Sequence, residues 1–315
     1  MVYKKHPFTV IELLVSITIL AILASLLMPN LVESRQRARF VRWLHFNKQC
    51  STDSSCVVNL NFQEGEGGLL KNSAQAYEAE GFNVSEYNGM IKGDYEWSQG
   101  RWTKGKRALQ LDGISTYIEF PKTEHVNFAG ENDFTVIISL KFDRLGKWDG
   151  LFGKCFMRNA VNGYPQYAMY YTASDNNKNS TEIFQMNIGG VSVSFDSLTE
   201  NGDKIKPIDN TNWLQIATRN KIVDGEQVVD VFVNGTKLKS TYKNTGGGQK
   251  ERDAANLAIG CIRWLVLDNR DKNNPVPEGK PDNFLKAKMD EFLVYNRALS
   301  DREINAHYLM GSEYL

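Results

Sequence analysis

The chain has 315 residues, of which 42% are hydrophobic and 23% are charged, a composition typical of folded globular proteins rather than disordered ones. Its 37 basic and 37 acidic side chains cancel, so no overall positive charge favours nucleic acid as a partner. This length fits one large β domain with an appendage, or two average domains.

The chain begins with a short basic segment (residues 1–7, MVYKKHP), followed by an apolar run, FTVIELLVSITILAILASLLM, from Phe8 to Met28. As a helix, this run would extend roughly 30 Å, enough to cross the hydrocarbon core of a bilayer. Because no small-residue cleavage motif follows it, the run predicts a retained membrane helix rather than a removed secretory signal.

Glu12 is the one ionisable side chain within the apolar run. A carboxylate in lipid is costly unless it reaches water or a cation. Two interpretations follow: Glu12 lies near the membrane surface and reaches water, or it pairs with a cation from another chain. Cleavage between Pro7 and Phe8 would create such a cation, the new α-amino group, and an ion pair in an apolar setting would fix the register between subunits.

Pro29 follows the apolar run and cannot donate a hydrogen bond to the carbonyl of Ser25, so a helix is expected to bend or open there. The next segment, 30–49, contains neither glycine nor proline, repeats apolar residues at helical spacing and is rich in arginine. Its basic face is either solvated or in contact with lipid headgroups or a neighbouring subunit. Counted alone, these basic residues would place the following domain in the cytoplasm. We expect one helix over 8–50 and a linker over 51–56.

These features together resemble the N-terminus of type IV prepilins and of the pseudopilins of type II secretion. The resemblance rests on the basic leader, Phe8, Glu12, the apolar run and Pro29. It implies cleavage before Phe8 by a prepilin peptidase, methylation of the new N-terminus, and extraction from the inner membrane by an assembly machinery. The product would be an extracellular helical filament of identical subunits. The family usually has glycine before the cut, whereas this chain has Pro7, so either the peptidase accepts proline or the leader is retained.

The rest of the chain, 57–315, alternates short β-type runs with turns rich in glycine, asparagine and aspartate. The Asn234-Gly235 step between two such runs is a strong hairpin signal. Ser300 and Glu303 form a capping-box pattern at the one later helix candidate, 300–309. Many short strands with few helices predict a sandwich or jelly roll. The predicted fold class is therefore α+β, a long N-terminal helix followed by an all-β sandwich.

Several motifs of this region resemble the laminin-G-like, concanavalin A-like jelly rolls of bacterial surface proteins. Among them are NFQEGEGG (61–68), GKRALQLDG (105–113) and DEFLVYNRALS (290–300). The resemblance implies a lectin-like sandwich. It also places Asp112 and Asp290 where this family often holds a structural Ca²⁺ ion, for which carboxylate oxygens are suitable ligands. Each aspartate would otherwise cap a turn.

A sugar site would need an aromatic platform with polar groups beside it. The best candidates are Tyr167 and Tyr170 of the aromatic-rich segment 164–171, together with Trp148 and Trp264, although alternating aromatic residues in a strand are more often packing residues. Related jelly rolls that cut polysaccharides carry Glu-x-Asp-x-x-Glu on one strand, and this chain lacks that motif. We therefore predict no catalytic activity and no organic cofactor.

The four cysteines, Cys50, Cys56, Cys155 and Cys261, fit no zinc-binding spacing. In an exported domain an even number suggests two disulfides. We favour Cys50–Cys56 and Cys155–Cys261 among the three possible pairings, with four buried free thiols as the alternative.

The sequence thus predicts a structural subunit of a type IV pilus-like filament that displays a lectin-like sandwich for adhesion, with surface glycans as partners. Two alternatives stay open. One is a minor pilin or a type II secretion pseudopilin, and the other is a membrane-anchored glycan-binding protein that does not polymerise.

Overall fold

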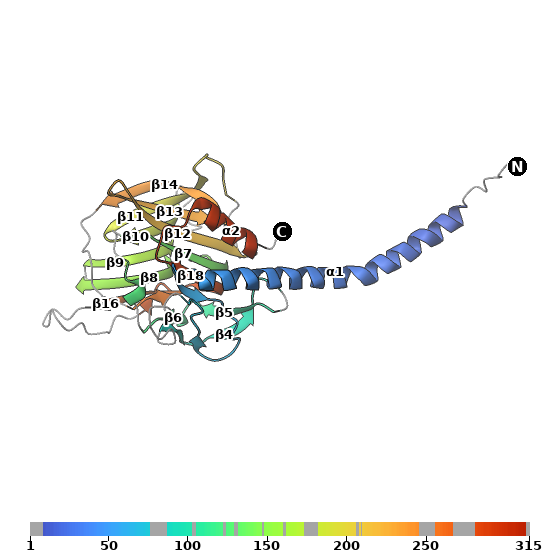
Figure 1. Cartoon of the computed structure of the whole chain (residues 1–315), viewed down its shortest axis with the longest axis horizontal. Coiled ribbons are helices and arrows are strands. Elements are labelled where there is room, and N and C mark those ends of the chain that lie inside the picture. Colours follow the sequence, from blue (N-terminus) through green and yellow to red (C-terminus); the bar gives the residue numbers. More distant parts are fainter. Residues whose placement is uncertain are drawn as a thin grey trace.

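The structure, a computed structural model, consists of a long helix, α1 (Val10–Thr52), that projects from a two-sheet β-sandwich (Figure 1). A second helix, α2 (Asp301–Gly311), lies beside the base of α1. The described residues are 9–75, 87–102, 105–121, 124–128, 132–146, 148–159, 162–172, 182–205, 208, 210–245, 256–266 and 281–312. The predicted fold class, a long helix followed by a concanavalin A-like sandwich, is confirmed.

α1 is one continuous helix that starts in a capping box. The Thr9 hydroxyl accepts a hydrogen bond from the Glu12 N–H (3.3 Å), and the Glu12 carboxylate accepts one from the Thr9 N–H (2.8 Å). The helix passes through Pro29 without interruption and bends along its length (Figure 1), as expected for a proline inside a helix. At its end, the N–H of Asp53 donates to the carbonyls of Gln49 and Cys50.

The first sheet has the order β4–β5–β18–β7–β12–β13, with β1 beside the second half of β18, and all its neighbours are antiparallel. Its strands are β1 (Cys56–Leu60), β4 (Glu96–Gln99), β5 (Arg107–Asp112), β7 (Phe134–Phe142), β12 (Leu214–Val223), β13 (Glu226–Val233) and β18 (Lys286–Tyr295).

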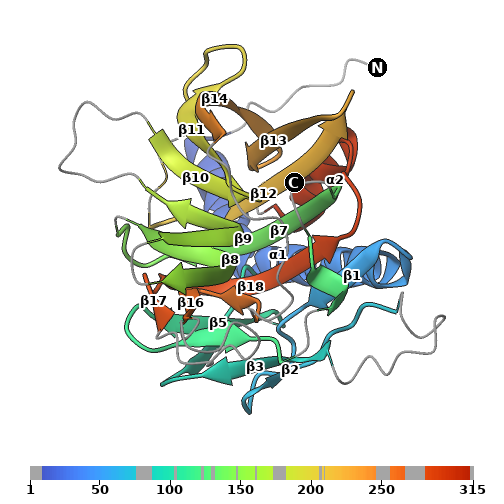
Figure 2. The same cartoon turned by 90° about the vertical axis from the view of Figure 1, so that its left-hand side faces the viewer.

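The second sheet has the order β2–β3–β6–β15–β8–β9–β10–β11–β14 (Figure 2). Its strands are β2 (Leu69–Leu70), β3 (Gly89–Lys92), β6 (Tyr117–Glu119), β8 (Asp149–Asn159), β9 (Asn162–Tyr171), β10 (Glu182–Ile188), β11 (Val191–Thr199), β14 (Thr236–Thr245) and β15 (Ala258–Ile259). β14 also pairs with β13 and so joins the two sheets, while β16 (Ile262–Val266) runs parallel to β8 and pairs with β17 (Pro281–Asp282). A short 3₁₀ helix, η2 (Glu124–Val126), precedes β7.

The side chains of β18 show that the first sheet lies between two apolar layers. Phe292 and Val294 point into the main core between the sheets. Leu293 and Tyr295 point the other way, into a second buried cluster that includes Cys50 of α1 and Ile304 of α2. Because both faces of the strand are covered here, its second half, 292–295, is a continuous apolar run rather than an alternating one.

Two local predictions of the sequence are confirmed. Asn234 and Gly235 both have positive φ (51° and 73°), and Val233 pairs with Thr236 across them, as in a two-residue hairpin turn. Ser300 caps α2, and its hydroxyl accepts the N–H of Glu303 while the Glu303 carboxylate accepts the N–H of Ser300.

Candidate functional site: the exposed helix and its junction with the sandwich

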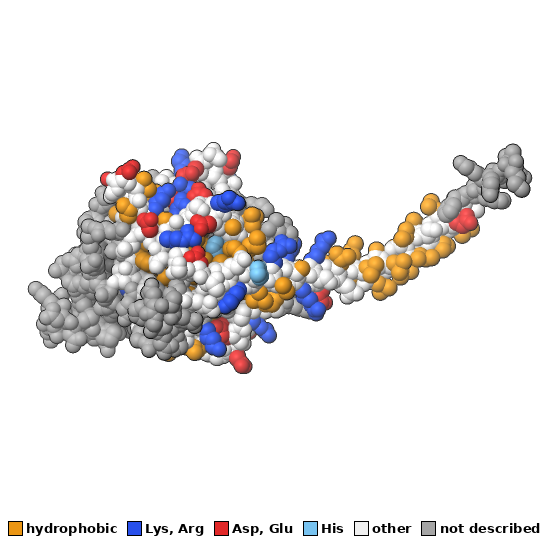
Figure 3. Space-filling view, in the orientation of Figure 1, with side chains coloured by type: hydrophobic (Ala, Val, Ile, Leu, Met, Phe, Trp, Pro, Cys, Tyr) orange, Lys and Arg blue, Asp and Glu red, His pale blue; other side chains and the backbone are white. Residues whose placement is uncertain are grey.

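The outer part of α1, from Val10 to Val32, has no contact with the sandwich and is exposed at every residue. Its apolar side chains are 50% to 77% exposed. Figure 3 shows them along the whole outer part, with basic side chains gathered closer to the sandwich. Within the described residues, this is the one helix long and apolar enough to cross a membrane. By length and composition, this helix could anchor the chain in a membrane or serve as a signal sequence.

Glu12 lies on this exposed part, and its carboxylate forms hydrogen bonds at the start of its own helix. Its carboxylate accepts from both the N–H and the hydroxyl of Thr9, each at 2.8 Å. The Thr9-x-x-Glu12 spacing is a capping-box pattern, so this cap could have been predicted from the sequence. Pro7 and Phe8, the predicted cleavage positions, lie outside the described residues.

The inner part of α1 packs on the turn between β4 and β5 through three aromatic rings. Phe40 stacks on Trp43 with centroids 6.0 Å apart, and Trp43 lies 5.9 Å from Trp102 of the turn. Gly105 of the same turn faces the ring of Phe40, where an added Cβ would approach it to 3.0 Å. Trp43 is 1% exposed, so this helix face belongs to the interior of the protein.

A buried charge network lies beneath these rings. Arg101 donates to Glu291 (2.8 Å) and pairs with Asp290 (3.0 Å) on β18. The indole N–H of Trp43 donates to the other oxygen of Glu291 at 2.8 Å. The Lys106 ammonium donates to the Asp290 carbonyl at 2.6 Å and lies 3.5 Å from the centroid of the Trp43 ring. The network therefore connects α1, the β4–β5 turn and β18.

Burial and neighbouring charges shift the pKa values of the groups in this network in opposite directions. Burial lowers the pKa of Lys106 to about 7, despite the nearby carboxylates. Burial also opposes ionisation of Glu291, but the charges of Arg101 and Lys106 and the Trp43 N–H outweigh it and lower the pKa of Glu291 to about 2. Glu291 is therefore a carboxylate at neutral pH, held by cations and by α1.

The aspartates predicted to bind calcium have other partners. Asp112 caps a turn, because one of its oxygens accepts from the backbone N–H groups of residues 114–116 at 2.8–2.9 Å. Asp290 is fully buried against Arg101. Since Asp112 pairs with Lys286 across β5 and β18, Asp290 lies four residues further along the strand. Within the described residues, no three acidic, histidine or cysteine side chains gather as metal ligands. The two aspartates therefore do not fit a shared Ca²⁺ site.

The predicted aromatic platform is only partly present as a surface. Tyr167 is buried and donates to the Val126 carbonyl at 2.9 Å, so it is a core residue. Trp148 is 41% exposed and packs edge-on against Tyr170, with centroids 6.0 Å apart. Its φ of 68° is unfavourable for a bulky residue, as often found at functional positions. Trp264 lies in β16, and its side chain is outside the described part of the chain.

All four cysteines are buried free thiols, which differs from the predicted disulfides. The thiol of Cys56 donates to the Val58 carbonyl, and burial raises the pKa of Cys50 to about 12. Cys50 and Cys56 nevertheless belong to the same buried cluster, at the junction of α1 with β1. Each thiol behaves as a small apolar side chain in its cluster.

His307 of α2 makes the junction with α1 sensitive to acid. Its ring lies edge-on to Phe46 of α1 (4.9 Å between centroids), and its Nε2 is 3.2 Å from the Tyr295 hydroxyl. Burial lowers the pKa of His307 from 6.5 to about 4. Between these values the unfolded chain binds a proton that the native chain does not, so the free energy of unfolding decreases as pH falls from 6.5 to 4.

Replacing His307 with phenylalanine should therefore reduce the pH dependence of stability by about one proton in this window. Urea unfolding of the full chain in detergent at several pH values between 4 and 6.5 measures it. The matched control is His45→Phe, since His45 is exposed on α1. An unchanged pH dependence in the His307→Phe variant would contradict the assignment.

The fold defines the class of the domain, which is a lectin-like β-sandwich attached to an apolar helix. The chain belongs to the concanavalin A-like lectin/glucanases superfamily, whose laminin-G family (Laminin_G_3) matches residues 112–305. No curated protein shows significant sequence similarity to the chain.

Several solved structures are similar to this chain. Domain 4 of AbnA, an extracellular arabinanase from Geobacillus stearothermophilus in complex with arabinotriose, has a TM-score of 0.46 and 17% identity, over 81% of this chain and 98% of that one. A Trypanosoma rangeli sialidase mutant with trans-sialidase activity has a TM-score of 0.47 and 15% identity, over 82% of this chain and 34% of that one. The binding domain of Paraclostridial Mosquitocidal Protein 1 has a TM-score of 0.43 and 16% identity, over 81% and 52%.

Proposed function

We propose that the protein is a subunit of a type IV pilus-like filament, anchored in the inner membrane before assembly and displaying a lectin-like sandwich outside the cell. The observation that supports this role most is the outer part of α1, which is apolar, unpacked and carries one acidic residue near its start. In lipid, helices gain little from association through the hydrophobic effect. Once extracted into water, burial of the same surface against neighbouring subunits strongly favours a bundle.

Glu12 provides the test of assembly. In a filament, its carboxylate would pair with the α-amino group of Phe8 in a neighbouring subunit, whereas in the single chain it caps its own helix. Glu12→Gln removes the charge but keeps side-chain groups that can serve a capping box. We expect normal membrane insertion and a decrease in sheared filaments on the order of tenfold or more, the equivalent of about 1.4 kcal/mol per subunit added.

The matched control is Glu33→Ala, which removes a carboxylate from the more polar part of the same helix, where Glu33 pairs with Arg37. Filament yield should be unchanged in this variant. A normal yield with Glu12→Gln would show that the charge does not direct assembly. N-terminal sequencing of the filament subunit would show whether the chain starts at Phe8 despite Pro7.

A second candidate function is a membrane-anchored glycan-binding protein that does not polymerise. It is favoured by the capping box, because Glu12 finds hydrogen-bond partners within its own helix and needs no other chain. Imaging of sheared surface material separates the two: fibres containing the chain support the first, and a dispersed membrane protein supports the second. Abundance would separate a main subunit from a minor pilin or pseudopilin.

A further inference from the structure

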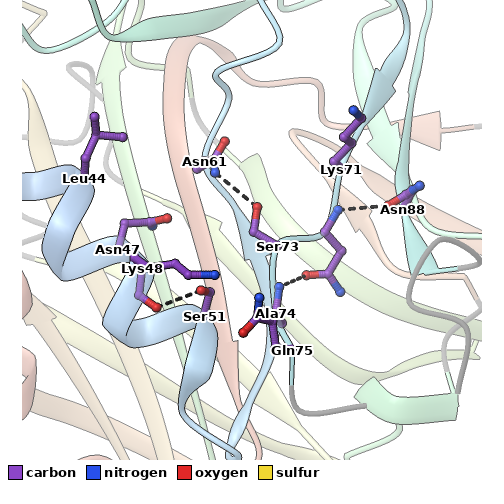
Figure 4. A pocket seen from close by; sticks show the side chains of 11 residues that line it. Leu44, Asn47, Lys48, Ser51, Asn61, Lys71, Ser73, Ala74, Gln75 and Asn88 are labelled. Carbon is purple, nitrogen blue, oxygen red and sulfur yellow. Dashed lines mark hydrogen bonds between the residues drawn. The ribbon is translucent and has the colours of Figure 1, made fainter. Parts of the chain in front are cut away.

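A polar groove of about 520 Å³ lies where the last turns of α1 meet the segment that connects β1 to β3. Figure 4 shows Asn47 and Lys48 extending from α1 toward the segment after β2 that carries Ser73 and Gln75. No local motif marks these residues in the sequence, because the groove exists only when the helix and the sandwich are joined.

The groove lining is unusual in its chemistry. Amides and hydroxyls predominate, two lysines stand on different walls (Lys48 on α1 and Lys71 after β2), and the described lining residues include neither a carboxylate nor an aromatic ring. Both lysines are exposed, so their ammonium groups are open to a ligand. The groove therefore presents positive charge together with many hydrogen-bonding groups.

A series of buried amides holds the two walls in place. Asn47 of α1 donates to the Asn59 side chain (3.1 Å), the Asn59 N–H donates to the Asn72 side chain (2.8 Å), and the Asn72 N–H donates to the Asn88 side chain (2.9 Å). Above them Asn61 donates to the Ser73 hydroxyl at 3.1 Å, as Figure 4 shows. Walls held by such hydrogen bonds lose little freedom on binding, which favours affinity.

We infer that this groove is a binding site for an acidic saccharide. Amide side chains both donate and accept, so they suit the hydroxyls of a sugar, and ammonium groups suit a carboxylate. A neutral sugar usually requires a stacking surface from an aromatic ring, and this groove offers charge in its place. The inference names a ligand class for the lectin-like part of the proposed function, and it does not depend on polymerisation.

The test uses the full chain in detergent and two probes of equal length, an oligogalacturonate and a neutral maltooligosaccharide, with calorimetry as the readout. The oligogalacturonate should bind, the neutral probe should not, and binding should weaken as salt increases, because exposed charges are screened. Lys48→Gln and Lys71→Gln should each weaken binding about tenfold. The control is Lys239→Gln, which removes an exposed ammonium from β14.

Three results would overturn the inference: no binding of the oligogalacturonate at millimolar concentration, equal binding of the neutral probe, or full affinity in both groove variants. Displacement of the saccharide by an equal concentration of a glutamate-rich peptide would instead assign the groove to an acidic protein segment. The groove variants leave the outer part of α1 unchanged, so they should form filaments normally. Loss of filaments with Glu12→Gln, by contrast, should leave saccharide binding intact.

Discussion

Replacing Arg101 with methionine is expected to decrease the free energy of unfolding by about 3–5 kcal/mol, the usual cost of removing one partner from a buried ion pair. Arg101 is the cation that both Asp290 and Glu291 contact, and all three side chains are at most 4% exposed. Without it, the two buried carboxylates would lose the cation that they share, and Lys106 alone would replace it poorly. Chemical unfolding of the full chain in detergent, followed by tryptophan fluorescence, measures the change.

The matched control is Arg297→Met. Arg297 also joins two carboxylates, those of Asp53 (3.2 Å) and Glu303 (2.7 Å), but its side chain is 39% exposed. Because exposed pairs contribute little, this variant should lose no more than about 1 kcal/mol. Equal losses of unfolding free energy in the two variants would mean that burial does not determine how much the Arg101 network contributes to stability.

Replacing Trp43 with alanine should decrease the free energy of unfolding by about 3–5 kcal/mol, as for other buried tryptophans. The change removes a ring in contact with Phe40 and Trp102, and it leaves one Glu291 oxygen without its indole donor. Since Trp43 belongs to α1, the inner turns of the helix should also become more accessible to protease. Unfolding experiments and limited proteolysis with mass spectrometry test both expectations.

Two further variants separate packing from hydrogen bonding. Trp43→Phe keeps an aromatic ring beside Lys106 but lacks the N–H, so it should lose about 1–3 kcal/mol, the cost of an unpaired buried acceptor. Trp148→Ala removes a tryptophan that is 41% exposed and should change stability by about 0.5 kcal/mol or less. A Trp43→Ala variant as stable as Trp148→Ala would contradict the assignment of α1 to the interior.

The fold could be predicted because its signals are local. The apolar run, the Asn234-Gly235 step and the Ser300–Glu303 pair each depend on residues within a few positions of one another. Helix periodicity and turn chemistry act over that range. The Thr9–Glu12 cap is equally local, but both interpretations of Glu12 from the sequence looked outside its own helix, to water or to a cation of another chain.

The site could be predicted only in part, since its contacts join distant positions. Glu291 accepts a hydrogen bond from Trp43, which lies 248 positions earlier in the chain, and no local motif at either residue predicts this contact. Asp290 was predicted as a metal ligand from a motif. That motif does not contain Arg101, which donates a hydrogen bond to the Asp290 carboxylate in the folded chain. The groove beside α1 was missed for the same reason, because its walls come from a helix and a strand segment that pack only in the folded chain.

The junction of α1 with the sandwich has a consequence for how a filament would present its domains. Three residues separate the end of α1 from β1, and one face of the last turns of the helix, with Trp43, Asn47 and Cys50, is buried. Each sandwich would therefore keep one fixed orientation relative to the fibre axis, and identical surfaces would recur at regular intervals. A ligand repeated along a polymer could then engage many copies at once, and such avidity can exceed the affinity of one site by about 10²–10⁴-fold. Adhesion by a fibre would then need only weak recognition by each domain.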